Sequence, residues 1–429
     1  MRHYFAHVIR SKGLANVLPR AMAIGRNFGF TEARIARKLA ALGELTARHN
    51  APLTACVTAC LVERYPRVVG AMRRRGWEIA VHGKVHCDFR QLDAQRQTSE
   101  MRQAIELYRR RLIEVSGFRA PYLAWNEGTR AAAAHARFRW TSNHALLWPV
   151  LARSQYRAGE WGALRKVLEH LYRPRLAEQS VSVPQMRGGV VEIPVSLPDD
   201  EILLDRLRLP EATVARLWLR VLEESRGRGE LAVLLIHHER MPEIGPPLEE
   251  VLNAARAVGR SLWLADLGTL AAWWQERAGF SFQVSGEPGS YEVQARCSGQ
   301  AVVLLKEAGG GCDHAAWREL PAGQRRIALE AEARPTIGLG PGVAFDAAEF
   351  LRNEGFAVEP RQGAHGLILE GPSRFGPEDE RRLLAQAEAA PGPLVRFARW
   401  PRGVQSALAL SMDVDSITLL DFMKRPLQR

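Results

Sequence analysis

Residues 77–88 read WEIAVHGKVHCD, and this stretch predicts both a fold and a site. Its apolar run at residues 79–81 predicts a short buried strand that ends at His82. His86 follows four positions later, so two imidazoles just past a strand end can aim two nitrogen ligands at one divalent ion. Taken alone, the pair could also be a surface loop histidine and a histidine capped by a backbone carbonyl.

Strands and helices alternate on both sides of this stretch. The expected elements include helices over 31–50, 65–75, 94–115, 211–226, 246–258 and 268–277, and strands at 53–61, 138–141, 190–197 and 231–238, with a further strand at the start of residues 118–125. This pattern gives about six strand–helix units before residue 280, which indicates a parallel sheet or barrel with sites at the strand C-termini.

The sequence pattern changes after residue 278. Short apolar runs separated by Gly, Pro and Ser indicate a small all-β module, and αβ alternation then returns in a small αβ module. The last segment is an apolar strand that runs into Asp413 and Asp415 and precedes a helix. The predicted parts are most of a barrel (1–278), the β module (279–337), the αβ module (338–400) and a final barrel strand and helix (401–429).

Polar groups follow four of the predicted strands. They are DVD at 413–415, HGKVH at 82–86, RAPY at 119–122 and LIHH at 235–238. In a parallel barrel these four strand ends lie on one rim. Two histidines and one carboxylate, with a position open for water, are typical of a catalytic rather than a structural zinc site. A second carboxylate two residues away would be free to act as a base.

These motifs resemble those of the polysaccharide deacetylases, also called carbohydrate esterase family four. In that family the order is a paired-aspartate motif, HxxxH, RxPY and a late Leu-His, whereas here the aspartate motif comes last. Placing residues 403–429 before residue 1 restores the family order, so the sequence is similar to a circularly permuted deacetylase. The resemblance covers residues 1–278 and 403–429 and implies an α/β fold: a distorted (β/α)7 barrel, with both small modules inserted before its C-terminal strand.

The resemblance also implies a role for each matching residue. Asp415, His82 and His86 would bind Zn²⁺, or another divalent ion such as Co²⁺, Ni²⁺ or Mn²⁺. The implied catalytic residues are Asp413 as general base, Arg119 as its ion-pair partner and His237 as the acid that protonates the departing amine. The implied oxyanion residue is Tyr122, through its backbone N–H. Trp140 and Asp199 are further candidates for contact with the substrate.

Simpler interpretations of several of these residues stay open. Asp413 could cap the helix that follows it, and Arg119 could be a surface charge. Asp199 and Asp200 could cap a turn instead of touching substrate hydroxyls, and Trp140 could be a core residue instead of a sugar platform. His238, next to His237, is interpreted as structural, and Cys87 is not expected to be a ligand.

The function that follows is a metal-dependent hydrolase that removes an acetyl group from an N-acetylated sugar linked to a nucleotide, lipid or other carrier. The DVD spacing resembles the allantoinase-like branch of the family, so hydrolysis of a small amide such as a ureide is an alternative. A catalytically inactive barrel that serves as a binding module is another. The final strand could complete its own barrel or that of a second subunit in a homodimer.

Charge and cysteine content bound the partners and the compartment. Lys and Arg exceed Asp and Glu by 59 − 47 = 12, which favours anionic partners, and no motif predicts specific nucleic-acid binding. Five scattered cysteines form no disulfide framework and suit a reducing compartment. Residues 1–31 have no acidic side chain, but Val8, Leu14 and Val17 lie at helical spacing, which favours a structural segment over a transit peptide. With no apolar run long enough to span a bilayer, we expect a cytoplasmic protein.

Overall fold

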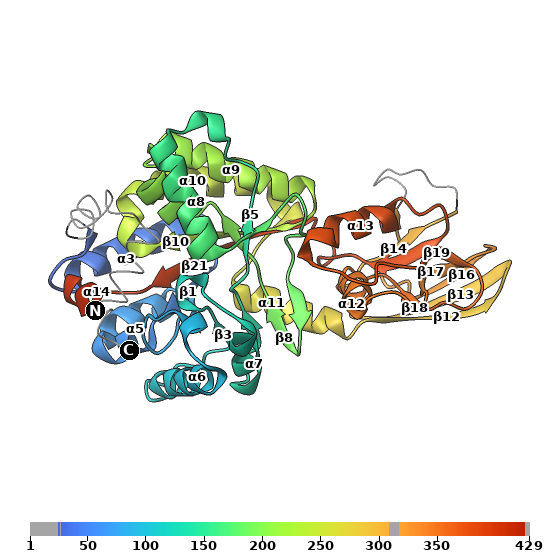
Figure 1. Ribbon diagram of the computed structural model, residues 1–429, viewed down its shortest axis with the longest axis horizontal. Coiled ribbons are helices and arrows are strands. Elements are labelled where there is room, and N and C mark those ends of the chain that lie inside the picture. Colours follow the sequence, from blue (N-terminus) through green and yellow to red (C-terminus); the bar gives the residue numbers. More distant parts are fainter. Residues whose placement is uncertain (1–24, 26, 309–316, 425–429) are drawn as a thin grey trace. The chain divides into compact units, whose positions relative to one another are not determined.

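A computed structural model describes residues 25, 27–308 and 317–424 of the chain (Figure 1). The chain divides into two compact units. Unit 1 comprises Met1–Pro174, Ser182–Ala271 and Ser406–Arg429, and unit 2 comprises Arg175–Val181 and Ala272–Gln405. The helical spacing from Val8 to Val17 lies outside the described residues.

Unit 1 has a mixed α/β architecture. Its strands are β1 (Leu53–Val57), β2 (Glu78–Val81), β3 (Gly117–Phe118), β4 (Trp140–Thr141), β5 (Ala145–Leu147), β7 (Gln185–Arg187), β8 (Val190–Glu192), β9 (Val195–Leu197), β10 (Leu231–His237), β11 (Leu262–Leu264) and β21 (Ser406–Val414). Its helices include α3 (Ala33–Arg48), α4 (Ala59–Arg64), α5 (Pro66–Arg74), α6 (Ala94–Arg109), α7 (Glu127–His135), α8 (Ala158–Val167), α9 (Glu211–Gly227), α10 (Met241–Val258) and α14 (Leu419–Lys424). The expected strand–helix alternation is therefore present.

The last strand of the chain lies in the middle of the sheet of unit 1. The hydrogen-bonded order is β5-β9-β10-β21-β1-β2-β3-β4-β8-β7, and β11 also pairs with β21. Strand β21 runs parallel to β1 and to β10, with Leu53 opposite Leu410 and Leu231 opposite Ala407, and the three strands can be followed in Figure 1. All nine residues of β21 are buried, as expected for a parallel strand covered on both faces.

Chain connectivity shows that this sheet is strongly curled. Strands β8 and β9 are far apart in the hydrogen-bonded order, on opposite sides of β21, yet only Ile193 and Pro194 join them in the chain. A connection this short spans about 10 Å at most. The two sides of the sheet must therefore turn toward each other. This gives a curled, half-barrel sheet whose strand C-termini gather at one rim.

The first strand is shorter than the sequence pattern predicts. A strand was expected over residues 53–61, but β1 ends at Val57 and α4 begins at Ala59. The N–H groups of Ala59 and Cys60 donate to the carbonyls of Gly83 and Lys84, at 2.9 and 3.0 Å. The loop between the two histidines thus caps the start of α4, so a tertiary contact overrides the apolar run.

Unit 2 contains three small sheets. The strands of these sheets are β12 (Ser281–Glu287), β13 (Ser290–Arg296), β14 (Val303–Lys306), β15 (Trp317–Glu319), β16 (Arg326–Leu329), β17 (Arg334–Leu339), β18 (Val358–Pro360), β19 (His365–Leu369) and β20 (Leu394–Phe397). The unit also contains the short strand β6 (Arg175–Leu176), which is in none of the three sheets, and helices α12 (Phe345–Asn353) and α13 (Glu380–Glu388). Helix α11 (Leu267–Ala278) spans the division between the units. Strand β14 pairs with β20, and β17 pairs with β18 and β19, so strand pairing crosses the expected module boundary at residue 337.

Membrane-spanning helices are not found in the part of the chain that the structure describes, because none of its helices is both long and apolar enough.

The start of β2 contains a half-buried carboxylate, Glu78, with three hydrogen-bond donors around it. Glu78 accepts hydrogen bonds from Thr54 Oγ1 at 2.7 Å, Gly268 N at 2.9 Å and Trp140 Nε1 at 3.2 Å. Burial raises the pKa of Glu78 to about 7. The folded protein therefore retains a proton here in a pH range where the unfolded chain has lost it.

We predict that titration of Glu78 lowers the free energy of unfolding as the pH rises from about 4.5 to about 7. The reason is that the unfolded chain releases this proton at a lower pH than the folded protein does. Glu78→Gln removes this titration. Between pH 5 and pH 7.5, the free energy of unfolding of the natural protein should fall by about 2 kcal/mol more than that of the variant. Urea unfolding at both pH values measures the difference, and equal pH dependence would contradict the prediction.

Candidate metal and hydrolytic site

The loop after β2 brings the two histidines together. Gly83, directly after His82, has a φ of +75°, and a Cβ at this position would lie 2.8 Å from the carbonyl oxygen of Val85. A residue with a side chain would be strained and crowded there, so glycine allows the tight turn. The turn returns His86 to the same side, with the two imidazole centroids 5.3 Å apart.

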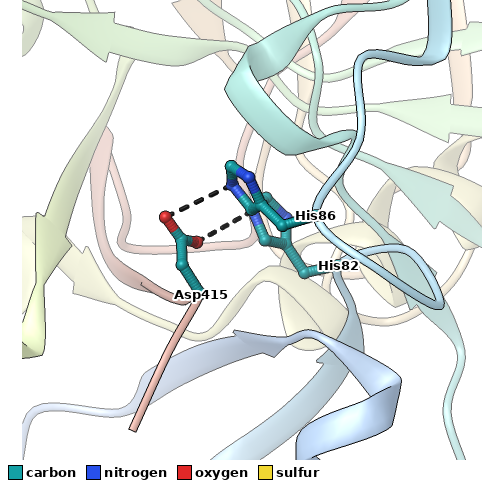
Figure 2. Close-up of side chains that lie close together, drawn as sticks. All are labelled: His82, His86 and Asp415. Atoms are coloured by element: carbon teal, nitrogen blue, oxygen red, sulfur yellow. Dashed lines mark ion pairs between the residues drawn. The ribbon is translucent and has the colours of Figure 1, made fainter. Parts of the chain in front are cut away.

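Asp415 completes a group of three candidate metal ligands. His82 Nε2 lies 3.2 Å from Asp415 Oδ1, and His86 Nε2 lies 3.2 Å from Asp415 Oδ2 (Figure 2). The ligand atoms of all three residues lie within 4.8 Å of one another. Both histidine side chains are buried, whereas 15% of the Asp415 side chain is exposed. The group is therefore reached from the carboxylate side.

The hydrogen bonding of His82 tests whether these residues fit a cation. Its Nδ1 lies 3.0 Å from the carbonyl oxygen of Arg119, which can only accept, so Nδ1 carries a proton. In the neutral ring, Nε2 then presents a lone pair, and this atom faces carboxylate oxygens of Asp415 at 3.2 Å and Asp413 at 3.7 Å. Lone pairs that converge in this way repel unless a positive charge lies among them. Two imidazole nitrogens and one carboxylate, with room for a further ligand, suit a divalent ion such as Zn²⁺.

Asp413 forms an ion pair with Arg119 beside this group. Arg119 Nη1 lies 3.0 Å from Asp413 Oδ1, and the Arg119 side chain is fully buried. Arg119 is thus not a surface charge. Asp413 does not cap the next helix either, because α14 begins at Leu419 and Asp421 accepts hydrogen bonds from Thr418 at that helix start.

Tyr122 lies beside the second histidine. Its ring packs edge-on against the His86 ring, with centroids 4.3 Å apart. Tyr122 and Leu123 both have positive φ, at 62° and 52°. Non-glycine residues in this conformation are uncommon and concentrate at functional sites. The RAPY segment therefore adopts an unusual backbone conformation next to the candidate ligands.

His237, at the end of β10, pairs with Asp200. Its Nδ1 lies 2.7 Å from Asp200 Oδ1, and its backbone N–H donates to Asp200 Oδ2 at 2.6 Å. Burial alone would lower the pKa of His237, but the Asp200 carboxylate raises it well above the ordinary value. His237 is also opposite Asp413 in the strand register. The imidazolium form of His237 is therefore favoured on the same rim as the Asp413 carboxylate.

Trp140 is a core residue, which corrects the expectation that it contacts substrate. The side chain is fully buried, and its indole N–H donates to Glu78 Oε1 at 3.2 Å. Its ring also covers Gly117, where an added Cβ would lie 1.9 Å from Trp140 Cε2. Glu78 marks the start of β2, at the end of the strand opposite His82. Trp140 thus packs below the sheet rim that carries the site.

Asp199 is likewise a structural residue instead of a substrate contact. It is fully buried, and its carboxylate accepts from the Tyr172 hydroxyl at 2.7 Å and from the Ile202 N–H at 2.9 Å. Burial, together with the neighbouring acidic groups Asp200 and Glu201, raises the pKa of Asp199 to about 7. The turn-capping interpretation is the one that this geometry supports, and the adjacent Asp200 is the residue that reaches the site.

His238 and Cys87 stand outside the candidate ligand group. His238 is fully buried, with Nε2 3.1 Å from the carbonyl oxygen of Ser416, in agreement with a structural interpretation. Cys87 follows His86 in sequence but is not a member of the group formed by His82, His86 and Asp415 among the described residues.

Several polar residues that the motifs do not contain also surround the site. Asp200, Ser411, Ser142, Asn143 and Glu192 are buried and hydrogen-bond to the candidate residues or to each other. The position of each after or within an expected strand was the only signal available in the sequence. Side-chain partners across the sheet could not be assigned without the register.

A comparison with protein families supports the resemblance. Residues 38–140 match the family model described as polysaccharide deacetylase. This span includes HGKVH and RAPY, two of the four motifs, and the predicted family resemblance is confirmed. No curated protein matches the chain.

Solved structures give more distant likenesses. A Mycobacterium smegmatis protein described as a polysaccharide deacetylase is 19% identical, and the match covers 55% of this chain and 76% of that one, with a TM-score of 0.43. A probable polysaccharide deacetylase from Pseudomonas aeruginosa PAO1 is 18% identical, with 55% and 72% covered and a TM-score of 0.43. The allantoinase Puue is 15% identical, with the same coverage and TM-score.

We predict that the apoprotein binds Zn²⁺ and that His86→Ala weakens this binding more than 100-fold, beyond the roughly 10–100-fold effect typical of outer-shell partners. Competition titration against a zinc indicator measures the affinity without reference to activity. Cys87→Ala, one position away, is the control and should bind as the natural protein does. An unchanged affinity in His86→Ala would contradict the ligand assignment.

We also predict that Asp200→Asn lowers the pKa of His237, because burial opposes the charged ring once the carboxylate is lost. Titration of the His237 ring by NMR, in both proteins, measures the shift. In the natural protein the ring should remain protonated to a higher pH than in the variant. Equal titration curves would show that Asp200 does not control the charge of His237.

Proposed function

We propose that this chain, which belongs to the polysaccharide deacetylase family through residues 38–140, is a metal-dependent hydrolase that removes the acetyl group from an N-acetylated sugar. The single observation that carries the proposal is the meeting of His82, His86 and Asp415 beside the buried Asp413–Arg119 pair. These residues come from three distant segments of the chain. Their convergence gives both a divalent-ion site and an adjacent carboxylate that can accept a proton.

Each proton transfer of the proposed reaction, and the stabilisation of the oxyanion, can be assigned to a residue of the chain. Asp413 would take the proton of the attacking water, and the Arg119 guanidinium holds its carboxylate in place at 3.0 Å. The backbone N–H of Tyr122 would donate to the oxyanion that develops from the amide carbonyl. His237, held in its protonated form by Asp200, would give a proton to the departing amine.

His82, His86 and Asp415 would hold the ion, which we propose to be Zn²⁺. When bound, such an ion lowers the pKa of water and polarises a carbonyl group. The nitrogen-rich ligand set favours Zn²⁺ or a similar transition ion over Mg²⁺ or Ca²⁺, which prefer oxygen ligands.

We propose further that the fold is a circularly permuted deacetylase barrel of the distorted (β/α)7 type. Strand β21 is last in the chain but lies parallel between β1 and β10. A family member with its aspartate motif first would place its first strand at this position. The modules of unit 2 are then insertions before the final barrel strand, and the barrel of one chain is completed by its own C-terminal segment.

The substrate class follows from charge and site chemistry. The net charge of +12 favours a sugar attached to an anionic carrier such as a nucleotide or lipid, and we propose a cytoplasmic location for the reaction. N-acetylhexosamine conjugates of these two kinds, with allantoin as a ureide, form the substrate panel. Turnover of allantoin alone would favour the allantoinase-like alternative, and bound metal without any turnover would favour a binding module.

We predict that the protein releases acetate from an N-acetylhexosamine conjugate and that Asp413→Asn lowers kcat roughly 10²–10⁴-fold, the usual contribution of a general base. Zinc affinity should stay close to that of the natural protein, because Asp413 is not among the three ligands. Asp421→Asn removes another buried aspartate that pairs with an arginine, Arg64 at 2.9 Å, and should retain kcat. Chelation should abolish turnover. Unchanged acetate release after chelation, or in Asp413→Asn, would refute the mechanism.

A further inference from the structure

Glu192 is a buried carboxylate at the end of β8, and none of the four motifs contains it. Only 8% of the residue is exposed. Its Oε1 accepts from the backbone N–H groups of Asn143 at 2.7 Å and His144 at 2.8 Å, and its Oε2 accepts from Thr141 Oγ1 at 2.6 Å. Glu192 therefore fixes the backbone that connects β4 to β5.

The loop that Glu192 fixes in turn holds the RAPY segment. The side chain of Asn143 accepts from the backbone N–H of Ala120 at 2.7 Å. Ser142 accepts twice from Arg119, through its hydroxyl from Nη2 at 2.9 Å and through its carbonyl from Nε at 3.2 Å. Ser142 and Asn143 are both buried, so water cannot readily replace these bonds.

Three candidate functional groups depend on this held segment. The Arg119 guanidinium reaches Asp413 at 3.0 Å, and the Arg119 carbonyl accepts from His82 Nδ1 at 3.0 Å. The backbone of Ala120, fixed by Asn143, lies two residues before the Tyr122 N–H. A shift of the loop would thus move three groups together. They are the Arg119 guanidinium that pairs with Asp413, the Arg119 carbonyl that accepts from His82, and the backbone N–H of Tyr122.

We propose that Glu192 is a positioning residue for the hydrolytic site, acting through Ser142 and Asn143 on Arg119, His82 and Tyr122. The proposal rests on the function proposed above. A displacement of about 1 Å of reacting groups can reduce a rate 10²-fold, so a carboxylate that touches no substrate can still set kcat. An effect on ground-state binding of the sugar is not expected, because Glu192 is buried and its carboxylate is hydrogen-bonded to Thr141, Asn143 and His144.

The alternative is that Glu192 contributes to stability alone, and the chain offers a matched control. Glu78 is also a carboxylate of unit 1 that accepts three hydrogen bonds, including one from a threonine hydroxyl and one from a backbone N–H. It lies at the start of β2, at the end of the sheet opposite His82. Loss of Glu78 should therefore lower stability without moving the site.

The experiment compares Glu192→Ala, Glu192→Gln and Glu78→Ala in the full chain. Glu192→Ala should lower kcat by about 10–100-fold with little change in KM, and should weaken zinc binding in an indicator titration, as expected when the support of a ligand is lost. Glu192→Gln keeps an oxygen for the N–H groups of Asn143 and His144 and should recover most of both values. Glu78→Ala should lower the unfolding midpoint and retain kcat and zinc affinity.

A double-mutant cycle tests the route from Glu192 to the site. Asn143→Ala removes the side-chain bond to Ala120 and leaves the Ser142 route intact, so Glu192→Ala should reduce kcat by a smaller factor in that background than in the natural protein. Natural kcat and zinc affinity in Glu192→Ala, or an equal loss of kcat in Glu78→Ala, would overturn the inference. If the natural protein releases no acetate, the proposed function fails, and the zinc titration still decides whether Glu192 supports the ligand group.

Discussion

The pairing of β21 with β1 and β10 is the constraint on which the site depends. Parallel pairing places Asp413 opposite Cys56 on one side and His237 on the other. Because side chains alternate along an extended chain, Asp413 and Asp415 point to the same side and Val414 to the other. A register shift of one residue would turn both carboxylates away from the histidines, so the buried apolar run of β21 fixes the chemistry as well as the core.

A single buried arginine then fixes the geometry at the end of this strand. Burial of an unpaired guanidinium would be costly, but Arg119 donates four hydrogen bonds, to Asp413, to Ser411 and twice to Ser142. A lysine has no planar arrangement of five N–H donors and could not make this set. The hydroxyl of Ser411 also donates to the Leu234 carbonyl, so the arginine is tied to β21 and β10 together.

The sequence was most informative about which polar residues gather at the strand ends. His82, His86 and Asp415 could be predicted because each directly follows or closely follows an apolar strand, and parallel strands end on one rim. Trp140 could not be assigned, because its burial depends on the space left by Gly117 and on Glu78 across the sheet. Asp199 and Asp200 are adjacent, and only the turn after β9 decides that the first caps Ile202 and the second pairs with His237. Such choices depend on tertiary contacts that hydrophobic periodicity does not encode.

The chain order of this fold separates formation of the core from formation of the site. Leu53 pairs with Leu410, a separation of 410 − 53 = 357 positions, and the residues of unit 2 from Ala272 to Gln405 come between them. Contacts of such long range carry a large loop-closure entropy, so they are expected to form late. Until β21 inserts, β1 and β10 lack their common neighbour, and His82 and His86 lack both carboxylates. Metal binding would then stabilise the inserted state alone, because only that state contains the full ligand set. The strand that leaves the site incomplete until late in folding would thus also let a bound ion stabilise the finished sheet.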